Sequence, residues 1–484
     1  MTFTTFTFLV FLIITFVGYW AMPTRRAQNA LLLIAGYLFY GWWDLRFGVL
    51  LLASSCVDYF VGQRLTVTED KTARKRLLSI SFVVNLGMLG FFKYFNFFAD
   101  SFVSMATAIG FRVNPVVVDV VLPVGLSFYT FQTLSYALDI YRGHLKPSKS
   151  FLDYLAFVSF FPQLVAGPIE RAGRMLPQFH GPRSIGVADI QAGLRQMLWG
   201  FVKKLVLADN LARVVDAHYK NVAGEPGPVL ALATVAFAFQ IYLDFSGYSD
   251  IAIGTARLFG FRLTRNFAYP YFSRTVTEFW RRWHISLSTW FRDYVYIPLG
   301  GSRVSRGRQA FNLLITFSIS GLWHGASYNY VIWGALNGLW MIPALLRGKQ
   351  SGERPTDIPG GEGLLPTPRA AFEMLRTFAA ICVTWVFFRA TTFGDAMTVF
   401  HHGVRDLFSA PAYAAALEVL RAERGLFVLV ALFMAIEWVQ RRHAGGGLEM
   451  PWPRPVRWAA YTACIWLCVL RMPNDVPTFI YFQF

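Results

Sequence analysis

The 484-residue chain has few charged residues. Only 15% of its residues are Asp, Glu, Lys or Arg, whereas a soluble globular domain has about 25%. Long runs carry no charge at all, as in Thr2–Met22 and Asn29–Trp43, and about 20 apolar residues are enough to cross the hydrocarbon core of a bilayer. The shortage of charge excludes a soluble, fibrous or disordered protein and predicts a polytopic integral membrane protein.

Cysteine and short catalytic motifs are scarce as well. The cysteines lie in apolar surroundings and show no CxxC or Cys/His metal spacing, so we expect small buried hydrophobic side chains there. The sequence contains no GxSxG elbow, no HExxH pair and no glycine-rich phosphate loop. Nucleophilic-serine and metal chemistry are therefore unsupported, and we expect no metal and no permanently bound cofactor. The four cysteines are Cys56, Cys382, Cys464 and Cys468.

Positive charge is what the chain has in excess. Lys and Arg number 45 against 28 Asp and Glu, which gives a formal net charge of +17. The bases gather in short loops beside apolar segments, as the positive-inside rule requires of cytoplasmic loops. No basic stripe stands apart from a membrane flank, so we expect no nucleic-acid partner. The main basic groups are Arg25-Arg26, Lys71–Arg76, Arg303–Arg308 and Arg441-Arg442.

Apolar segments of helical length follow one another along the chain and predict an all-α polytopic membrane protein. The basic loops place both termini outside and give ten or twelve crossings. Residues 348–369, rich in Gly and Pro, are expected to form a cytoplasmic loop, and residues 472–484 an extracytoplasmic tail. The sequence shows no internal repeat and no soluble domain, so we interpret residues 1–484 as one membrane domain. The expected helices cover residues 3–22, 28–43, 47–63, 78–98, 120–141, 150–166, 190–215, 229–259, 310–345 (two helices), 370–389, 425–440 and 456–471.

Proline and glycine interrupt one of these segments with particular density. Pro162, Gly167 and Pro168 fall within FFPQLVAGPIER. Irregular backbone at membrane depth is tolerated only where it is buried in protein or lines a cavity. The pattern predicts a broken or re-entrant segment at this position.

Two acids stand in an otherwise apolar stretch. Asp244 and Asp250 lie in YLDFSGYSDIAIG, and a carboxylate at membrane depth is costly unless it is paired or solvated. Their spacing of six does not stack them on one helix face, so a paired-carboxylate site has weak support. Either each acid bonds to a nearby Arg or backbone amide, or the acids belong to a proton or ion pathway.

A dense group of charged and aromatic residues follows within 16 positions. One interpretation is an interfacial amphipathic helix with an aromatic and basic face. The other is a site that faces an anionic cofactor from the cytoplasmic side, because Arg supplies phosphate-directed donors. Composition alone does not decide between them. The group contains Glu278, Arg281, Arg282, His284, Arg292 and Asp293 with Trp280, Trp283 and Trp290.

His324 is isolated in a long apolar run. A lone His in such a run is usually a satisfied core residue, but a buried neutral imidazole can also take a proton from a hydroxyl near neutral pH. Gly321, Gly325 and Ala326 flank it, and we expect these small residues to open space beside the ring.

Several long motifs, in this order, resemble the membrane-bound O-acyltransferases, and most closely the bacterial alginate O-acetyltransferase-like branch. The resemblance covers roughly residues 5 to 345 and the last six residues. The motifs are FPQLVAGPIER (161–171), GFVKKLVLAD (200–209), YLDFSGYSDIAIG (242–254), EFWRRWHISLSTWFRDYVYIPLGG (278–301) and GLWHGASYNYVIWG (321–334).

The resemblance implies a fold of many transmembrane helices, with re-entrant or interfacial helices, around a central funnel. It also implies two functional histidines, matched by His284 and His324, with His324 as the principal catalytic residue. An acyl thioester, acetyl-CoA by expectation, would approach from the cytoplasm as the donor substrate. On this basis Arg281, Arg282, Trp283 and Arg292 are expected to bind the donor, and Asp244, Asp250, Glu278 and Asp293 to be structural or tunnel-lining polar residues.

The C-terminal FIYFQF (479–484) resembles the terminal motif of a small partner protein in teichoic-acid D-alanylation, where a terminal Tyr is thought to carry the acyl group. Tyr481 would then be the acceptor hydroxyl that relays the acyl group. The alternative is an interfacial aromatic anchor.

The resemblance further implies a bacterial inner-membrane location and a periplasmic SGNH-hydrolase-like partner that moves the acetyl group onto an exported polysaccharide. Alginate, cellulose, peptidoglycan and other exopolysaccharides all stay open as acceptors. Two other classes also stay open. A transporter or flippase would use Asp244, Asp250 and His324 as an ion pathway, and a scaffold of an export complex would tolerate loss of His324.

Overall fold

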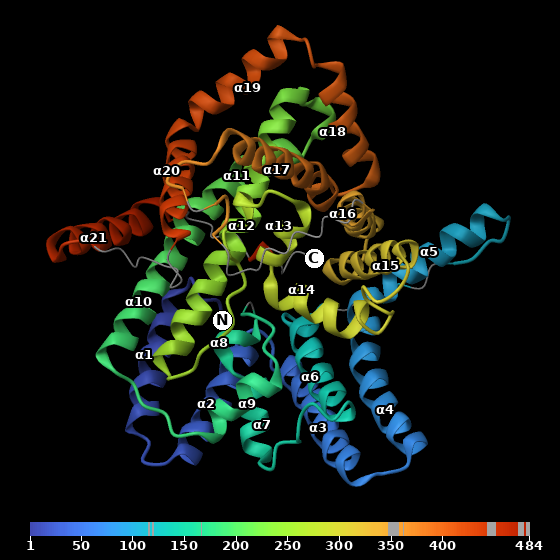
Figure 1. The fold of residues 1–484 in the computed structure, drawn as a ribbon, viewed down its shortest axis with the longest axis vertical. Coiled ribbons are helices and arrows are strands. Elements are labelled where there is room, and N and C mark those ends of the chain that lie inside the picture. Colours follow the sequence, from blue (N-terminus) through green and yellow to red (C-terminus); the bar gives the residue numbers. More distant parts are fainter. Residues whose placement is uncertain are drawn as a thin grey trace. The chain divides into compact units, whose positions relative to one another are not determined.

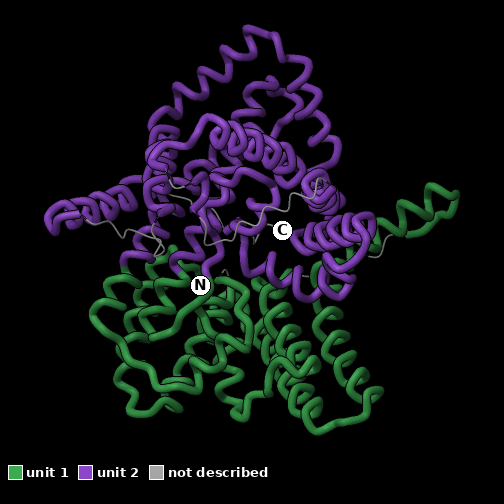
Figure 2. Tube along the Cα trace, viewed as in Figure 1, with its two compact units in different colours: residues 1–194, 252–264 green, residues 195–251, 265–484 purple. Residues whose placement is uncertain are grey.

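Helices, turns and loops make up the part of the chain that the structure, a computed structural model, describes. That part comprises residues 1–114, 117–118, 121–165, 167–346, 358–361, 363–442, 452–472 and 479–480, and it contains no strand. The all-α prediction is thus confirmed. The chain divides into two compact units (Figure 2), unit 1 with residues 1–194 and 252–264 and unit 2 with residues 195–251 and 265–484.

Unit 1 is formed mainly by the N-terminal helices, coloured blue to green in Figure 1. Each of its first four α-helices begins after a Thr or Asp whose side chain accepts a backbone N–H. These helices are α1 (Phe6–Ala21), α2 (Arg25–Gly41), α3 (Leu45–Val67), α4 (Lys71–Leu89), the π-helix η1 (Gly90–Tyr94), α5 (Phe95–Ala108), α6 (Leu126–Tyr141), α7 (Phe151–Val158), α8 (Phe161–Leu164), α9 (Ala172–His180) and the start of α10 (Val187–Phe201).

Unit 2 continues from the end of α10 and contains the histidines of interest. Its π-helices are η2 (Val202–Ala208) and η5 (Arg292–Tyr296), and its 3₁₀ turns are η3 (Val222–Gly224) and η4 (Pro270–Phe272). Its α-helices are α11 (Asp209–Tyr219), most of α12 (Gly227–Leu258), α13 (Val276–Arg282), α14 (Ile285–Phe291), α15 (Arg306–His324), α16 (Tyr328–Leu346), α17 (Pro368–Arg389), α18 (Phe393–Arg405), α19 (Ala410–Ala422), α20 (Arg424–Gln440) and α21 (Arg454–Arg471).

A buried hydrogen-bond network joins three helices of unit 1. Asn85 of α4 donates to the Asp58 carboxylate of α3 over 2.8 Å, and its own oxygen accepts from Ser54 at 2.7 Å and from Thr133 of α6 at 3.1 Å. Ser81 also donates to Asp58. Buried polar groups are stable only when they are hydrogen-bonded, so this network fixes the register of α3, α4 and α6.

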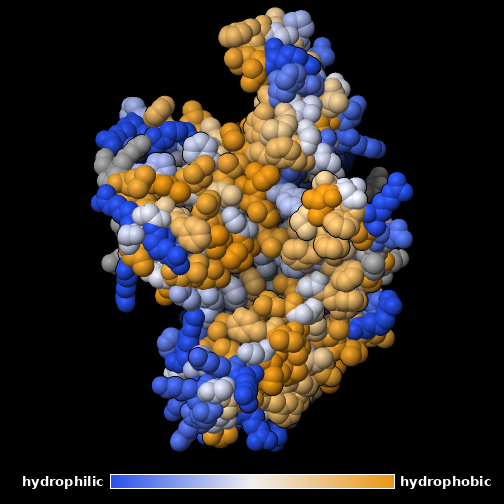
Figure 3. All heavy atoms as spheres, turned by 90° about the vertical axis from the view of Figure 1, so that its right-hand side faces the viewer, coloured by the Kyte–Doolittle hydropathy of each residue, from blue (hydrophilic) through white to orange (hydrophobic). Residues whose placement is uncertain are grey.

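Several helices are long and apolar enough to cross a bilayer. Figure 3 shows a face on which hydrophobic side chains cover broad areas. On α1, for example, Ile13, Ile14 and Val17 are each more than 60% exposed, as expected of lipid-facing positions. The predicted ten to twelve crossings stay a prediction. By length and hydropathy, the described residues contain four candidate spans, Leu45–Val67, Lys71–Ala108, Gly227–Leu258 and Pro368–Arg389, with Phe6–Ala21 as a shorter apolar helix.

The structure confirms two local predictions and adds helices that the sequence did not suggest. The predicted break is real, because α8 ends at Leu164 and a Cβ on Gly167 would overlap the backbone of Gln163. The run 310–345 forms two helices, α15 and α16. No helix was expected between residues 389 and 425, where α18 and α19 mix short apolar runs with charge. Residues 348–357 and 362 of the predicted loop lie outside the described residues.

Candidate functional site

His324 is the last residue of α15 and is buried among aromatic rings. Its imidazole centroid lies 5.0 Å from the ring of Trp323, 4.9 Å from Trp333 of α16 and 5.4 Å from Phe388 of α17. Only 3% of the residue is exposed. The three rings form a dry environment in which an imidazole can exchange a proton with a bound hydroxyl without competition from bulk water.

The glycines beside His324 do not open space next to the imidazole, so that expectation was wrong. A Cβ on Gly321 would overlap the backbone carbonyl of Tyr330, and one on Gly325 would overlap the Tyr330 ring. The missing side chains instead allow α16 to approach α15 closely. The pairing of α15 with α16 therefore sets where the His324 ring lies.

His284 joins α13 to α14 in a backbone conformation that is rare for a residue with a side chain. Its φ is +41°, in the left-handed region. Asn266 holds it there, because its carbonyl accepts the N–H of Ile285 at 2.9 Å and its side-chain oxygen accepts from the N–H and hydroxyl of Ser286. Strained residues persist only where their surroundings enforce them, and they concentrate at functional sites.

The His284 and His324 rings both pack against the ring of Trp323. The His284 centroid is 6.3 Å from the Trp323 ring, and the side chain also contacts Phe245 at 4.6 Å and Phe267 at 6.5 Å. His284 is fully buried. The structure thus brings together the two histidines that the sequence singled out, although they belong to different helical segments.

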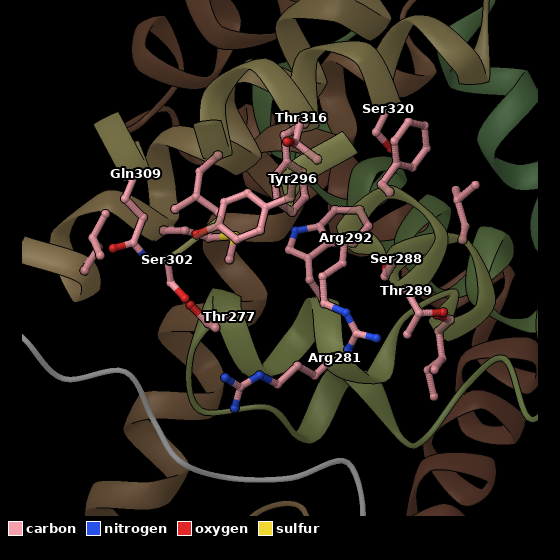
Figure 4. A pocket seen from close by; sticks show the side chains of 18 of the residues that line it. Thr277, Arg281, Ser288, Thr289, Arg292, Tyr296, Ser302, Gln309, Thr316 and Ser320 are labelled. Atoms are coloured by element: carbon pink, nitrogen blue, oxygen red, sulfur yellow. The ribbon is translucent and has the colours of Figure 1, made fainter. Parts of the chain in front are cut away.

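A cavity of about 580 Å³ extends along α15 in unit 2 (Figure 4). Thr316 and Ser320 line it, and His324 follows Ser320 by one turn on the same helix face. Trp280, which also lines the cavity, packs on Trp333 at 5.6 Å, and Trp333 in turn contacts His324. The complete lining is Thr277, Trp280, Arg281, Ile285, Leu287, Ser288, Thr289, Phe291, Arg292, Tyr296, Ser302, Gln309, Leu313, Thr316, Phe317, Ser320, Met341, Ala344 and Leu345.

The predicted donor-binding residues separate into two groups. Arg281 and Arg292 line the cavity (Figure 4), with Arg292 also paired to Asp293 at 2.7 Å. Arg282 and Trp283 are buried and are not part of the lining. The Arg282 guanidinium instead forms a 3.0 Å ion pair with Glu278. The geometry therefore gives Arg281 and Arg292 access to a ligand and gives Arg282 a structural partner.

Asp250 is half-buried and belongs to a charge cluster around Lys203 of η2. Its carboxylate lies 2.9 Å from Lys203 Nζ and accepts from Gln196 at 3.1 Å. Lys203 also lies 3.5 Å from the Glu437 carboxylate, which accepts the Tyr242 hydroxyl at 2.8 Å. We call these five residues the Lys203 cluster. The partners of Asp250 are a lysine and a side-chain amide, whereas an arginine or a backbone amide was expected.

Asp244 belongs to a second cluster around the next residue of η2. Lys204 Nζ lies 2.6 Å from Asp209 and 2.9 Å from Asp244 Oδ1, and all three side chains are buried. The other Asp244 oxygen accepts the backbone N–H of Ile480 at 2.9 Å. We call Lys204, Asp209 and Asp244 the Lys204 cluster. Tyr481 itself lies outside the described residues.

Close helix packing explains how the lysines reach α12. A Cβ on Gly200 would lie 2.6 Å from the Gly247 carbonyl oxygen, and one on Gly247 would lie 2.9 Å from the Gly200 carbonyl oxygen. The two backbones can therefore touch just before the lysines. Sequence reasoning missed Lys203, Lys204 and the partners Asp209 and Glu437. The pair of lysines inside the apolar run GFVKKLVLAD was the available signal, since buried ammonium groups need carboxylate partners.

No three His, Cys, Asp or Glu side chains of the described residues gather where they could share a metal ion. The site offers imidazole and guanidinium groups, hydroxyls and a dry aromatic wall. This combination suits proton transfer and the binding of an anionic ligand in an all-α membrane protein.

Comparison with known proteins identifies the family. A model of the membrane-bound O-acyltransferase (MBOAT) family matches residues 141–349. The chain is 40% identical over 393 residues to a probable alginate O-acetylase (AlgI) of Pseudomonas aeruginosa, covering 81% of this chain and 72% of the relative. It is 33% identical over 420 residues to a peptidoglycan O-acetyltransferase of Helicobacter pylori, covering 80% and 77%. A teichoic acid D-alanyltransferase of Streptococcus thermophilus is 30% identical over 245 residues, covering 47% and 58%.

The chain therefore belongs to the membrane-bound O-acyltransferase family, as the sequence motifs suggested. It is a multi-pass membrane protein and an O-acyltransferase enzyme. The matched region, 141–349, contains both histidines and every residue that lines the cavity.

Proposed function

We propose that this enzyme moves an acetyl group from a cytoplasmic thioester, acetyl-CoA, across the bacterial inner membrane for O-acetylation of an exported or cell-surface polysaccharide. The observation that carries the proposal is the cavity along α15, which has Arg281 and Arg292 in its wall and His324 one turn beyond Ser320. The named activities of the alginate and peptidoglycan relatives support a polysaccharide as the final acceptor.

The lining of the cavity suits both the anionic part and the thioester end of an acyl donor. Guanidinium groups bind phosphate oxygens through charge-assisted hydrogen bonds, so Arg281 and Arg292 would hold the anionic part of the donor. The thioester would then extend along Thr316 and Ser320 toward His324. Burial of His324 among aromatic rings excludes water, which would otherwise hydrolyse the thioester.

His324 would act as the general base. Its imidazole takes the proton of an acceptor hydroxyl while the hydroxyl oxygen attacks the thioester carbonyl, and the thiolate leaves and is protonated in turn. Help of this kind is typically worth roughly 10²–10⁴ in rate. His284 would position the acceptor, because its strained backbone fixes its ring against Phe245 and Phe267 and near Trp323.

Tyr481 would supply the first acceptor hydroxyl and carry the acetyl group as a tyrosyl ester. Support comes from the residues just before it. Phe479 and Ile480 are buried, and the Phe479 ring lies 5.6 Å from Phe245, which contacts His284. The chain therefore comes near His284 at Phe479, two residues before Tyr481.

A periplasmic SGNH-like acetyltransferase would accept the group from the relay and transfer it to the polysaccharide. This arrangement requires that the C-terminal tail, and the N-terminus with it, lie on the extracytoplasmic side. Accessibility of a single introduced cysteine at each terminus to a membrane-impermeant thiol reagent in intact cells would test that orientation.

The decisive experiment gives purified protein in nanodiscs acetyl-CoA labelled in the acetyl group. Wild type should release CoA and retain label, whereas His324→Gln should lose both by roughly 10²–10⁴. His402→Gln is the matched control, since His402 is also buried but bonds to the Glu225 carbonyl outside the site. Tyr481→Phe should lose retained label.

The outcomes separate the proposals. Label retained by Tyr481→Phe but lost by His324→Gln would keep the base and discard the relay. Absence of CoA release in every sample, even with a cognate partner protein, would contradict the acetyl-CoA donor. Movement of a substrate across the bilayer without thioester cleavage would instead favour the transporter alternative.

A further inference from the structure

Phe479 and Ile480, the described residues of the C-terminal segment, are buried inside unit 2. Phe479 is fully buried and Ile480 is 2% exposed. The Phe479 ring lies 4.3 Å from the ring of Tyr248 and 5.6 Å from that of Phe245, both on α12. Two aromatic contacts and burial of an aliphatic side chain fix this short segment against one face of α12.

A single carboxylate connects this segment to the buried charges. Asp244 Oδ2 accepts the Ile480 backbone N–H at 2.9 Å, while Asp244 Oδ1 lies 2.9 Å from Lys204 Nζ. Lys204 is itself paired to Asp209 at 2.6 Å. The two oxygens of one carboxylate thus have separate roles, one structural and one directed at the tail.

Tyr248 strengthens the same connection. Its ring lies 5.4 Å from Lys204 Nζ and packs on Phe479. The Lys204 cluster therefore reaches the tail through a hydrogen bond at Ile480 and through an aromatic contact at Phe479. Asp250 lies on the same helix and also pairs with a lysine, but its partners are Lys203 and Gln196 and include no described residue of the tail.

We infer that Asp244 is a positioning residue that latches the C-terminal segment into the enzyme through the Ile480 N–H, with Lys204 and Asp209 holding the latch in place. The role of the latched segment in transfer rests on the proposed relay at Tyr481, whereas the latch itself does not. The latch fixes the backbone at Ile480, the last described residue before the proposed relay.

Digestion of the full-length protein in nanodiscs by carboxypeptidase, followed by mass spectrometry of the C-terminus, measures release of the tail. Wild type should resist digestion at Ile480. Asp244→Ala should be trimmed past Ile480 roughly 10- to 100-fold faster, the effect of losing one hydrogen bond to a charged group. Asp244→Asn keeps an acceptor oxygen and should restore part of the protection.

Ile480→Pro tests the same bond from the tail, where it cannot disturb the folding of α12. It removes the N–H donor and should release the tail as Asp244→Ala does. The double variant should be no faster than Ile480→Pro alone, because Asp244→Ala removes only the hydrogen bond that Ile480→Pro has already removed. Asp250→Ala is the matched control and should leave the tail protected.

Unchanged digestion in both Asp244→Ala and Ile480→Pro would overturn the latch, as would equal release by Asp250→Ala. Transfer kinetics then address the relay separately. With a working relay, Ile480→Pro should lower kcat and leave the KM for acetyl-CoA unchanged. Tail release without any loss of transfer would keep the latch and reject the relay. Loss of label in Tyr481→Phe, without tail release in Asp244→Ala or Ile480→Pro, would keep the relay and reject the latch.

Discussion

The two units of this protein differ in the polar groups that they bury. Unit 1 buries mostly amides and hydroxyls, with carboxylates such as Asp58 and Asp153 bonded to Asn side chains. Among the described residues, every buried lysine, arginine and histidine lies in unit 2. These are Lys203, Lys204, Arg282, Arg441, His284, His324 and His402.

This difference has an energetic meaning. A hydrogen-bonded amide network fixes helix register, and a neutral buried group that loses its partner lowers the free energy of unfolding by only about 1–3 kcal/mol. A buried ion pair adds little net stability, yet breaking it costs about 3–5 kcal/mol. Unit 2 therefore buries the charged groups whose loss of a partner costs more, and it is also the unit that contains His284, His324 and the cavity.

The largest effect should follow from removing one buried cation. Lys204→Met leaves Asp209 and Asp244 buried without their shared counter-charge, so we expect a loss of about 3–5 kcal/mol of stability. Denaturant unfolding in detergent micelles, followed by tryptophan fluorescence, measures it. Replacing both carboxylates as well, in Lys204→Met with Asp209→Asn and Asp244→Asn, should recover part of the loss; a failure to recover would show that packing rather than charge is responsible.

The corresponding change in unit 1 should be smaller. Asn85→Ala removes a donor to Asp58 and an acceptor for Ser54, and we expect a loss of about 1–3 kcal/mol. The same unfolding measurement applies, with Ser79→Ala as a control on the exposed side of α4, where the hydroxyl bonds only within its own helix turn. If Asn85→Ala were as damaging as Lys204→Met, the contrast between the units would not hold.

A third change separates functional from structural charge within unit 2. Arg281→Gln removes a guanidinium from the cavity wall and should raise the KM for acetyl-CoA roughly 10-fold or more, since a hydrogen bond to a charged group is worth about 1.5–3 kcal/mol. The midpoint of unfolding should change little. Arg369→Gln is the control, because Arg369 is an exposed helix residue paired to Glu373. Equal KM values for both variants would reject donor binding by Arg281.

Much of this architecture was accessible from the sequence because its signals are local. The charge-free runs predicted helices, Pro162 and Gly167 predicted the break after α8, and the motifs around His284 and His324 predicted the two histidines. Each of these features is encoded by residue types at fixed spacing within a few turns. Short helices such as α18 and α19 were missed because their apolar residues are interspersed with charge and do not form a run.

The partners of the buried charges were not accessible in this way. Glu437 and Ile480 lie far along the chain from Lys203 and Asp244, and only the folded chain brings them together. The role of Gly321 was also misjudged, since a glycine in a helix predicts space equally well for a ligand and for a neighbouring helix. Pairing between distant segments is a property of the packed structure, and no periodicity in one segment specifies it.

The smallest effect should come from a charge that caps helix ends rather than one paired with a buried lysine. Asp406 follows α18 and lies at the N-terminal end of α12. The Arg405 guanidinium, and then the N–H of Gly227 at the start of α12, hold the pKa of the Asp406 carboxyl well below its usual range. A depressed pKa means that the ionised form stabilises the fold at neutral pH and that this contribution is lost as pH falls below about 4, where an unfolded aspartate takes up its proton. Asp406→Asn should therefore lower the melting temperature slightly at pH 7, and the difference from wild type should shrink toward pH 3. A difference that stayed constant with pH would mean that Asp406 acts through packing, and the contrast between capping charge and buried charge would then need another explanation.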